Sequence, residues 1–305
     1  MSVRLQVTMK HQLSSKGLSW TSVQSPTPEE LAEFVRTAGL LAYDAEFVAA
    51  DHHRPEITVR SDYLLLLIQI PVFERKARLT TGASLYFIIR SQELFSLHYQ
   101  PLVALDRVRR SFETSPVRQE EYFSASALSL CLTIITMLYD SAFRKLERLA
   151  KHIDIAEDAV FQGNERKMVE EISVLTRDVM DFRKVIRPQT RLFANRPQHP
   201  FLAPEVNTQW QRAQGQLLKI WEILESMMES VRELSSTNFT LLQHKENEIL
   251  RILTIYSIIA VPAFILVAPL NLPELKLYSL PFFAYLGLVA VFALILVIIF
   301  YRTRR

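Results

Sequence analysis

Two hydroxyl-bearing residues, Thr254 and Ser257, interrupt an otherwise apolar stretch near the C-terminus. From residue 252 to residue 273, 22 positions carry no charge. Steps of three or four residues keep to one face of a helix. Taken from Asn247, such steps give Thr254, Ser257 or Ile258, Val261, Phe264 or Ile265, and Ala268. Oxygen atoms on this face could meet a hydrated cation, although span hydroxyls also bond their own backbone four residues earlier.

Two further polar residues lie just beyond this stretch. Asn271 offers an amide carbonyl, which suits hydrated cations, but asparagine is also a common choice for turn geometry. Glu274 could concentrate cations through its negative charge, or it could be an ordinary solvated charge beside Lys276. The face that starts at Asn247 and these two residues together outline a possible path for a cation.

Other residues have metal-ligand types without a complete metal-binding pattern. His244 and Glu248 are four residues apart, a spacing at which an imidazole and a carboxylate could share a metal on one helix face. The Asp51-His52-His53 run is less suitable, because adjacent side chains in a strand or turn point apart. Acidic residues that could form regulatory cation sites, or simply a solvated helix face, are Asp154, Glu157, Asp158, Glu170 and Glu171.

The apolar stretch is one of two that are long enough to cross a bilayer. Residues 252–273 and 277–301 lack charge over 22 and 25 positions, whereas a span needs about 20 apolar residues. We expect spans at about 250–268 and 280–301, joined by a periplasmic loop at 269–279 and followed by a basic tail at 302–305. Because Lys and Arg flank the outer ends of the pair and are scarce in the loop, the pattern places both termini in the cytoplasm.

A long helix leads into the first span. From Glu205 no helix breaker occurs until Pro262, so residues 205–268 are expected to form one stalk helix of about 90 Å at 1.5 Å per residue. Its apolar seam has the spacing of a coiled coil, which several copies packed side by side would bury. The seam consists of Trp210, Leu217, Trp221, Leu224, Met228 and Val231.

The remaining chain divides into an α/β part and a helical part. Residues 1–123 alternate short apolar runs with polar turns, which indicates strands, and Thr27 with Glu30 forms a capping-box pattern at a helix start. The expected strands are Val3–Met9, Ile57–Val59, Tyr63–Ile70, Ser84–Ile89 and Leu94–Tyr99. Residues 124–195 predict two antiparallel helices, the second kinked or ended by Pro188.

Composition argues against several function classes. The net charge of +3 is too small to favour nucleic-acid binding. Six glycines and no glycine-rich phosphate loop leave no sign of nucleotide-driven chemistry, and no nucleophile motif is present. We therefore expect no enzyme, no catalytic residue and no cofactor.

The whole layout resembles the CorA superfamily of divalent cation channels, which have two transmembrane helices. The stretch from Asn247 to Ile255, NEILRILTI, is similar to the family's Asn-x-x-Met-Lys-x-Leu-Thr at the start of the first span, and Pro262 lies where the family has a proline. The family's Gly-Met-Asn signature is missing, since residues 268–274 are APLNLPE. This departure is similar to the divergent branch of CmaX-type proteins and to the zinc-handling ZntB branch.

The resemblance implies a homopentamer in the lipid of a bacterial inner membrane, with the first spans around an axial pore. Divalent cations would pass passively, and Asn271 would present a ring of amides. The missing signature, together with His244 near the membrane, favours zinc over magnesium as the transported ion. The alternative is a membrane-anchored scaffold or metal sensor that keeps the fold and does not conduct.

Overall fold

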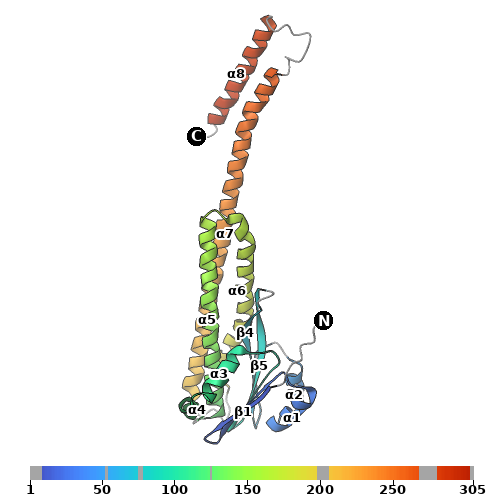
Figure 1. The fold of residues 1–305 in the computed structure, drawn as a ribbon, viewed down its shortest axis with the longest axis vertical. Coiled ribbons are helices and arrows are strands. Elements are labelled where there is room, and N and C mark those ends of the chain that lie inside the picture. The colour runs from blue at the N-terminus through green and yellow to red at the C-terminus, as the bar shows by residue number, and fades with distance from the viewer. Residues whose placement is uncertain are drawn as a thin grey trace. The chain divides into compact units, whose positions relative to one another are not determined.

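The computed structural model of the chain describes residues 9–51, 54–74, 78–123, 126–197, 206–267 and 280–302. The chain divides into two compact units, unit 1 from Met1 to Ser235 and unit 2 from Ser236 to Arg305. Unit 1 contains a sheet with its covering helices, and unit 2 is helical (Figure 1).

The described part of unit 1 is built on a six-stranded sheet with the order β1-β2-β6-β5-β4-β3. The strands are β1 (Met9–Ser15), β2 (Leu18–Gln24), β3 (Glu56–Val59), β4 (Leu64–Glu74), β5 (Leu79–Ile89) and β6 (Glu93–His98). Neighbours are antiparallel except for β2 and β6, which run parallel. The predicted strands at 57–59, 63–70, 84–89 and 94–99 are confirmed, whereas β2 was not predicted and most of Val3–Met9 lies outside the described residues.

Two short helices cover one face of the sheet. They are α1 (Pro28–Ala38) and α2 (Ala42–Ala49). Apolar residues of both helices join alternate residues of the central strands in one core. These core residues include Phe34, Val48, Leu65, Tyr86 and Phe95. The predicted capping box starts α1, because Thr27 Oγ1 accepts from the Glu30 amide and Glu30 Oε2 accepts from the Thr27 amide.

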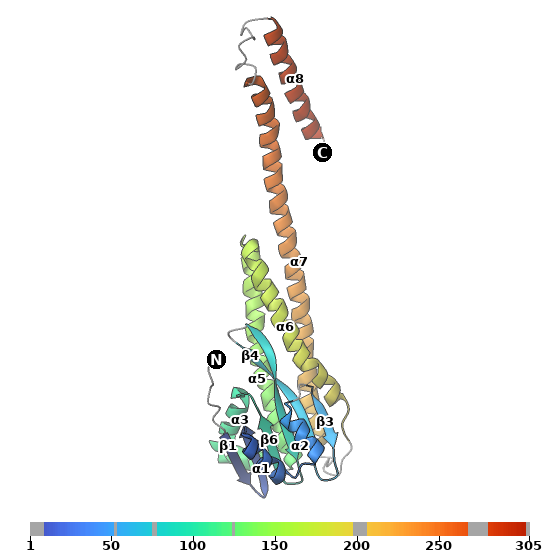
Figure 2. The same cartoon turned by 90° about the vertical axis from the view of Figure 1, so that its right-hand side faces the viewer.

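Two long helices cover the opposite face and form an antiparallel pair (Figure 2). These are α5 (Ala127–Phe161) and α6 (Glu165–Ala194), separated by a turn in which Gly163 adopts a φ of 91°. Strand β4 is buried from Leu64 to Ile70 because helices lie over both of its faces. Two shorter helices, α3 (Val103–Glu113) and α4 (Pro116–Tyr122), connect the sheet to α5.

Pro188 does not end α6, which continues to Ala194. A proline within a helix removes one backbone donor and crowds the preceding turn. Next to it, Gln189 is fully buried, and its amide nitrogen donates to the carbonyl oxygens of Gln69 on β4 and Val185 on α6, both at 2.8 Å. Packing of α6 on the sheet therefore outweighs the local disruption.

Helix α7 (Val206–Val267) is continuous over 62 residues. The apolar seam of its first part is mostly buried within unit 1, with Leu217, Leu224 and Val231 fully inaccessible. Near its start, Trp210 Nε1 donates to the Phe193 carbonyl of α6 at 3.0 Å. The expectation that neighbouring copies would bury this seam is therefore wrong, because α7 packs on its own chain there.

The last described helix is α8 (Leu280–Arg302). It contains no charged residue until Arg302 at its end.

Candidate functional site

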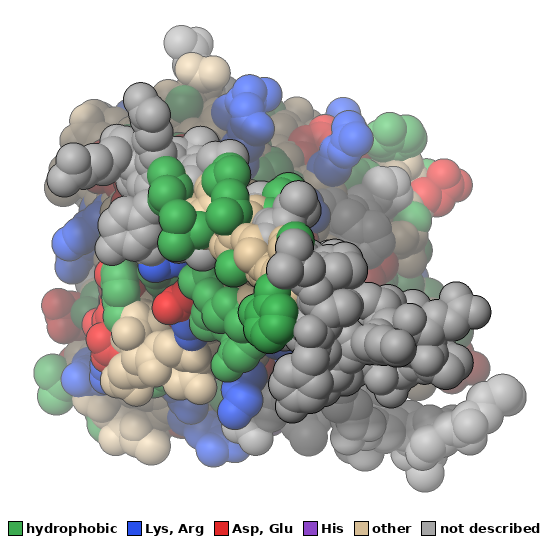
Figure 3. Space-filling model, turned by 90° about the horizontal axis from the view of Figure 1, so that it is seen from above, with side chains coloured by type: hydrophobic (Ala, Val, Ile, Leu, Met, Phe, Trp, Pro, Cys, Tyr) green, Lys and Arg blue, Asp and Glu red, His purple; other side chains and the backbone are tan. Residues whose placement is uncertain are grey.

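The second part of α7 exposes large apolar side chains in the single chain. Ile249, Tyr256 and Phe264 are 64%, 68% and 75% exposed. Helix α8 has the same character, with Phe283, Val291 and Leu294 more than half exposed. Seen from above, hydrophobic side chains gather near the middle of the view (Figure 3). Such a surface would be costly in water, at about 25 cal/mol per Å², so it requires lipid or protein around it.

The two predicted hydroxyls both bond to their own helix. Thr254 Oγ1 donates to the Leu250 carbonyl at 2.8 Å, and Ser257 Oγ donates to the Leu253 carbonyl at 2.9 Å. A hydroxyl has one donor and two acceptor lone pairs. The bond to the carbonyl uses only the donor, so each oxygen keeps its acceptor capacity. Because both side chains are exposed, the backbone bond and a role towards a hydrated cation are compatible.

The other residues of the predicted pore face are placed only in part. Asn247 and Val261 are exposed, and Ile258 is half-buried. Ile265 lies within α7, but its side chain is outside the description. Ala268, Asn271 and Glu274 lie outside the described residues, so the predicted mouth stays a prediction.

The candidate metal ligands are exposed and do not form a complete site in the described chain. His244 and Glu248 lie one turn apart on α7, and Asp154 and Asp158 lie one turn apart on α5. Among the described residues, no three His, Cys, Asp or Glu side chains come together as a metal-binding group. Since protein zinc sites use three or four protein ligands, each pair needs further ligands from elsewhere. His52 and His53 lie outside the described residues.

Arg78 engages one of the acidic residues of the helical pair. Its guanidinium donates to both carboxylate oxygens of Glu171 at 3.0 and 2.6 Å. This hydrogen bonding lowers the pKa of Glu171. Glu171 therefore ties α6 to the loop before β5 and is not a free cation ligand.

A buried polar cluster joins the sheet to the helical pair, and sequence analysis missed it. Lys145 of α5 donates to Thr80 Oγ1 of β5, and the Thr80 hydroxyl donates to Asp178 of α6. All three residues are buried, and the Lys145 ammonium lies over the rings of Phe73 and Phe182. The sequence signal that could have revealed it is the position of Lys145, a charged residue on the apolar face of α5. The other buried residues of this face include Leu138, Ala142, Leu149 and Ile153.

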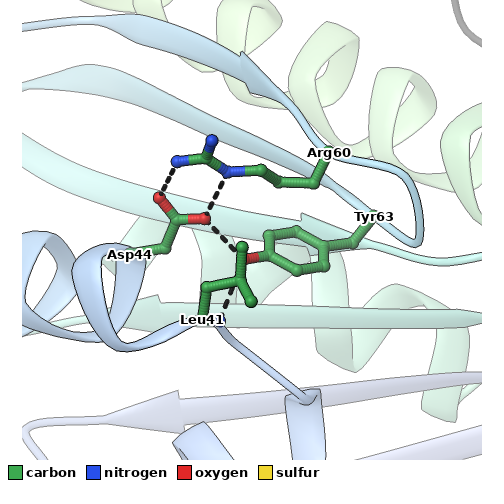
Figure 4. Close-up of polar contacts among 4 residues, drawn as sticks. All are labelled: Leu41, Asp44, Arg60 and Tyr63. Carbon is green, nitrogen blue, oxygen red and sulfur yellow. Dashed lines mark hydrogen bonds and ion pairs between the residues drawn. The ribbon is translucent and has the colours of Figure 1, made fainter.

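A second buried cluster holds α2 on the sheet (Figure 4). The Asp44 carboxylate accepts from Arg60 Nε at 2.8 Å, from Arg60 Nη2 at 2.7 Å and from the Tyr63 hydroxyl at 2.5 Å. The Leu41 amide in turn donates to the Tyr63 oxygen at 3.1 Å. The contacts are internal and fully paired, so this cluster positions α2 rather than binding a ligand.

Length and composition alone do not separate core helices from membrane helices in this chain. Within the described residues, α5 is the one helix that is long and apolar enough to cross a membrane, yet 67% of its apolar window is buried inside the chain. Packing on the sheet and on α6 explains its composition. Residues 280–301 lie within α8 and residues 250–267 lie within α7, and that these two stretches cross a membrane remains a prediction.

Known proteins with the same architecture span most of the chain. The structure matches a CorA magnesium transporter from Methanocaldococcus jannaschii at 23% identity and a TM-score of 0.76, over 95% of this chain and 92% of that one. It matches the full-length CmaX protein at 17% identity and a TM-score of 0.76, over 94% and 89% of the two chains. These likenesses confirm the predicted CorA-like fold.

Sequence comparison gives the family. The cobalt/magnesium transport protein CorA of Thermotoga maritima is 20% identical over 266 residues, which cover 83% of this chain and 73% of that protein. The model of the CorA-like Mg²⁺ transporter protein family matches residues 15–302. The chain therefore belongs to the CorA-like Mg²⁺ transporter protein family, whose members are membrane transporters of divalent cations and not enzymes.

Proposed function

We propose that the chain forms a homopentameric channel through which divalent cations pass passively, along an axial pore lined by α7. The observation that carries the proposal is the second part of α7, a continuous helix with exposed apolar residues and two hydroxyls within a stretch that lacks charge. Five such helices would bury one face against each other and present the remaining apolar surface to lipid and α8. Passive flux agrees with the lack of a phosphate loop in the sequence.

The proposed pore face has an apolar middle with polar residues on both sides of it. It comprises Asn247, Thr254, Ser257, Ile258, Val261, Ile265, Ala268 and Asn271, with Glu274 at the mouth. A bare divalent ion in an apolar passage is prohibitively costly, so the ion would keep its water. The Thr254 and Ser257 oxygens would accept from that water, and the ring of Ile258 and Val261 would be a hydrophobic constriction that opens by wetting.

We propose zinc as the preferred ion over magnesium. The relatives are named for magnesium and cobalt, but this chain lacks the Gly-Met-Asn signature that the family presents to hydrated magnesium. His244 lies one turn before Asn247, at the cytoplasmic end of the proposed pore face. In a pentamer, copies of His244 and Glu248 would supply the ligands that a single chain lacks, and imidazole suits zinc better than magnesium.

The membrane arrangement is proposed on the same basis. Both spans would cross the bacterial inner membrane, with the loop at 269–279 in the periplasm and both termini in the cytoplasm. Asp154 and Asp158 would then lie on the cytoplasmic side, where carboxylates of neighbouring copies could form a regulatory cation site. Both residues are exposed on α5, so their carboxylates are accessible to a neighbouring copy.

A membrane-anchored scaffold or metal sensor is the second candidate function. It is favoured by the apolar middle of the pore face, from Ile258 to Ala268, and by the two hydroxyls that bond their own backbone. Zinc uptake by cells that express the wild type, Asn271→Ala or Thr254→Leu tests between the two. The channel predicts uptake above the empty-vector control for the wild type and reduced uptake for both variants. If all three equal the control, the scaffold is the better account.

A further inference from the structure

A cavity of about 160 Å³ lies in unit 1, between the β4–β5 hairpin and the helices α5 and α6. It lies far along the chain from the proposed pore face and is lined by residues that the proposed transport does not use. Part of its lining is apolar and consists of Phe73, Leu149, Val174 and Leu175. An engineered apolar cavity of about 150 Å³ accepts one benzene ring. The cavity therefore has the size for a single small ring or a branched aliphatic group.

The rest of the lining is mainly basic. It contains Arg78, Lys145, Arg148 and His152, and Asp178 is the one acidic residue among the lining residues in the described chain. Two of the cations already have carboxylate partners, since Arg78 pairs with Glu171 and Lys145 lies 3.9 Å from Asp178. These pairs hold the wall of the cavity in place, because each joins two different elements.

Arg148 is the arginine of this lining that has no carboxylate partner within the described chain. Its Nε donates to the Arg144 carbonyl at 3.3 Å, and within the described chain its guanidinium makes no ion pair. The terminal nitrogens of a guanidinium match a carboxylate or phosphate group bidentately. His152 lies one turn further along α5 and lines the same cavity, so it offers a second donor to an anion held by Arg148.

We propose that this cavity binds a small organic anion, with its ring or aliphatic body among Phe73, Leu149, Val174 and Leu175 and its anionic group on Arg148 and His152. The anionic group is a carboxylate or a phosphate, because both offer the oxygen pair that a guanidinium recognises. Since the cavity is formed by the hairpin together with α5 and α6, a bound ligand would contact all three elements. The site is independent of whether the chain conducts ions.

Calorimetric titration of the full-length chain in detergent micelles tests the proposal. The probes are benzoate and phenyl phosphate, with phenol as the uncharged ring and inorganic phosphate as the anion without a ring. Benzoate, phenyl phosphate or both should bind with Kd below about 1 mM, and phenol and inorganic phosphate should bind much more weakly. The relative affinities of benzoate and phenyl phosphate distinguish a carboxylate ligand from a phosphate ligand.

Three variants show whether binding occurs in this cavity. Arg148→Gln should weaken binding by about tenfold or more, since it removes a charge-assisted bidentate contact, whereas Arg144→Gln, on an exposed residue of the same helix outside the cavity, should leave binding unchanged. Val174→Phe should abolish binding, because the larger side chain would fill part of the cavity. Partitioning of the probes into detergent micelles is the same for all variants, so it cancels when their affinities are compared. Two results would overturn the proposal. One is that neither organic anion binds at about 10 mM, which is 10 times the expected upper limit of Kd. The other is that the wild type and Arg148→Gln bind with equal affinity.

Discussion

At the scale of single residues, Asp44 shows how a charge is kept inside the α/β part of the chain. Its side chain is almost inaccessible, and Arg60 donates two hydrogen bonds to it while Tyr63 donates a third. The hydrogen bonds from Arg60 lower the pKa of Asp44, although burial acts in the opposite direction. Because Arg60 itself is partly exposed, the pair can be formed without removing both charges from water.

We predict that Arg60→Met destabilises the full chain at pH 7 by more than the same change at an exposed ion pair, because it leaves the buried Asp44 charge without its partner. Urea unfolding in detergent, followed by tryptophan fluorescence, measures the change. The Lys10–Glu33 pair provides the control, since both side chains are more than half exposed. Lys10→Met should cost less than about 1 kcal/mol. A small effect for Arg60→Met would show that Asp44 is neutral or solvated.

The same carboxylate predicts a loss of stability in acid. The pKa of Asp44 is lower in the folded chain than its ordinary value near 3.9. Its stabilisation is therefore present above pH of about 4 and is lost as the pH falls through the folded-state pKa. Asp44→Asn should be less stable at pH 7 and should lose less stability between about pH 5 and pH 2 than the wild type. Parallel pH curves for the two proteins would contradict this assignment.

Thr254 is the residue that links the backbone hydrogen bond to the proposed pore. Thr254→Val keeps the shape of the side chain and removes the oxygen that would accept from the ion's water, so we predict that flux falls about tenfold, which corresponds to about 1.4 kcal/mol. The matched control is Thr240→Val, because Thr240 Oγ1 donates to the Ser236 carbonyl in the same way and lies before the predicted span. Equal flux for both variants would show that the Thr254 hydroxyl serves only its own helix.

At the scale of secondary-structure elements, Lys145 joins β5, α5 and α6. Burial lowers the pKa of this lysine to about 8, with a further lowering by Arg148 and an opposing effect of Asp178. The unfolded chain holds the same proton up to about pH 10.4. Between these values the unfolded state binds more protons, so the unfolding free energy should rise with pH.

We predict that Lys145→Met removes this rise. The methionine would keep the apolar contacts with Phe73 and Phe182 and would not titrate. The measurement is the shift of the urea midpoint between about pH 7 and pH 9.5, a range that covers most of the titration of Lys145. Lys151→Met is the control, because Lys151 is an exposed lysine on the same helix. If both variants behave like the wild type, Lys145 does not titrate in this range.

The sequence predicts those elements whose signals are local. The Thr27–Glu30 capping box, the long periodic helices and four strands follow from residue types and spacing. Strand β2 was missed because its LSWTSVQ sequence has no simple alternation, although most of it is buried. Helix α2 was missed because it is short and has no side-chain cap.

Contacts between distant elements limit what the sequence can predict. Lys145, Thr80 and Asp178 are far apart in the sequence, so their cluster follows only from the packing of α5 and α6 on the sheet. The buried seam on α7 has coiled-coil spacing, but spacing does not say whether the partner is another copy or the same chain. The pore mouth at Ala268–Glu274 lies outside the described residues, and a ring of five copies is not a property of one chain.

At the scale of the whole molecule, two observations support the proposed channel. The chain belongs to the CorA-like Mg²⁺ transporter protein family, and the helices of unit 2 expose large apolar side chains. The chain would anchor a cytoplasmic α/β and helical body to a two-span membrane part, and five copies would enclose the pore. Native mass spectrometry from detergent should give a complex five times the mass of the 35.3 kDa chain. A monomer or dimer under conditions that preserve transport would contradict the pentamer.

Ion flux into liposomes that contain only the purified full-length chain tests the central claim most directly. Zinc, magnesium, cobalt and nickel are supplied outside in turn, and a fluorescent chelator inside reports each ion. The account predicts flux without ATP, driven by the concentration gradient, with zinc faster than magnesium, and reduced flux for Thr254→Val but not for Thr240→Val. Faster magnesium than zinc would contradict the ion preference, and no flux for any of the four ions would contradict the channel itself.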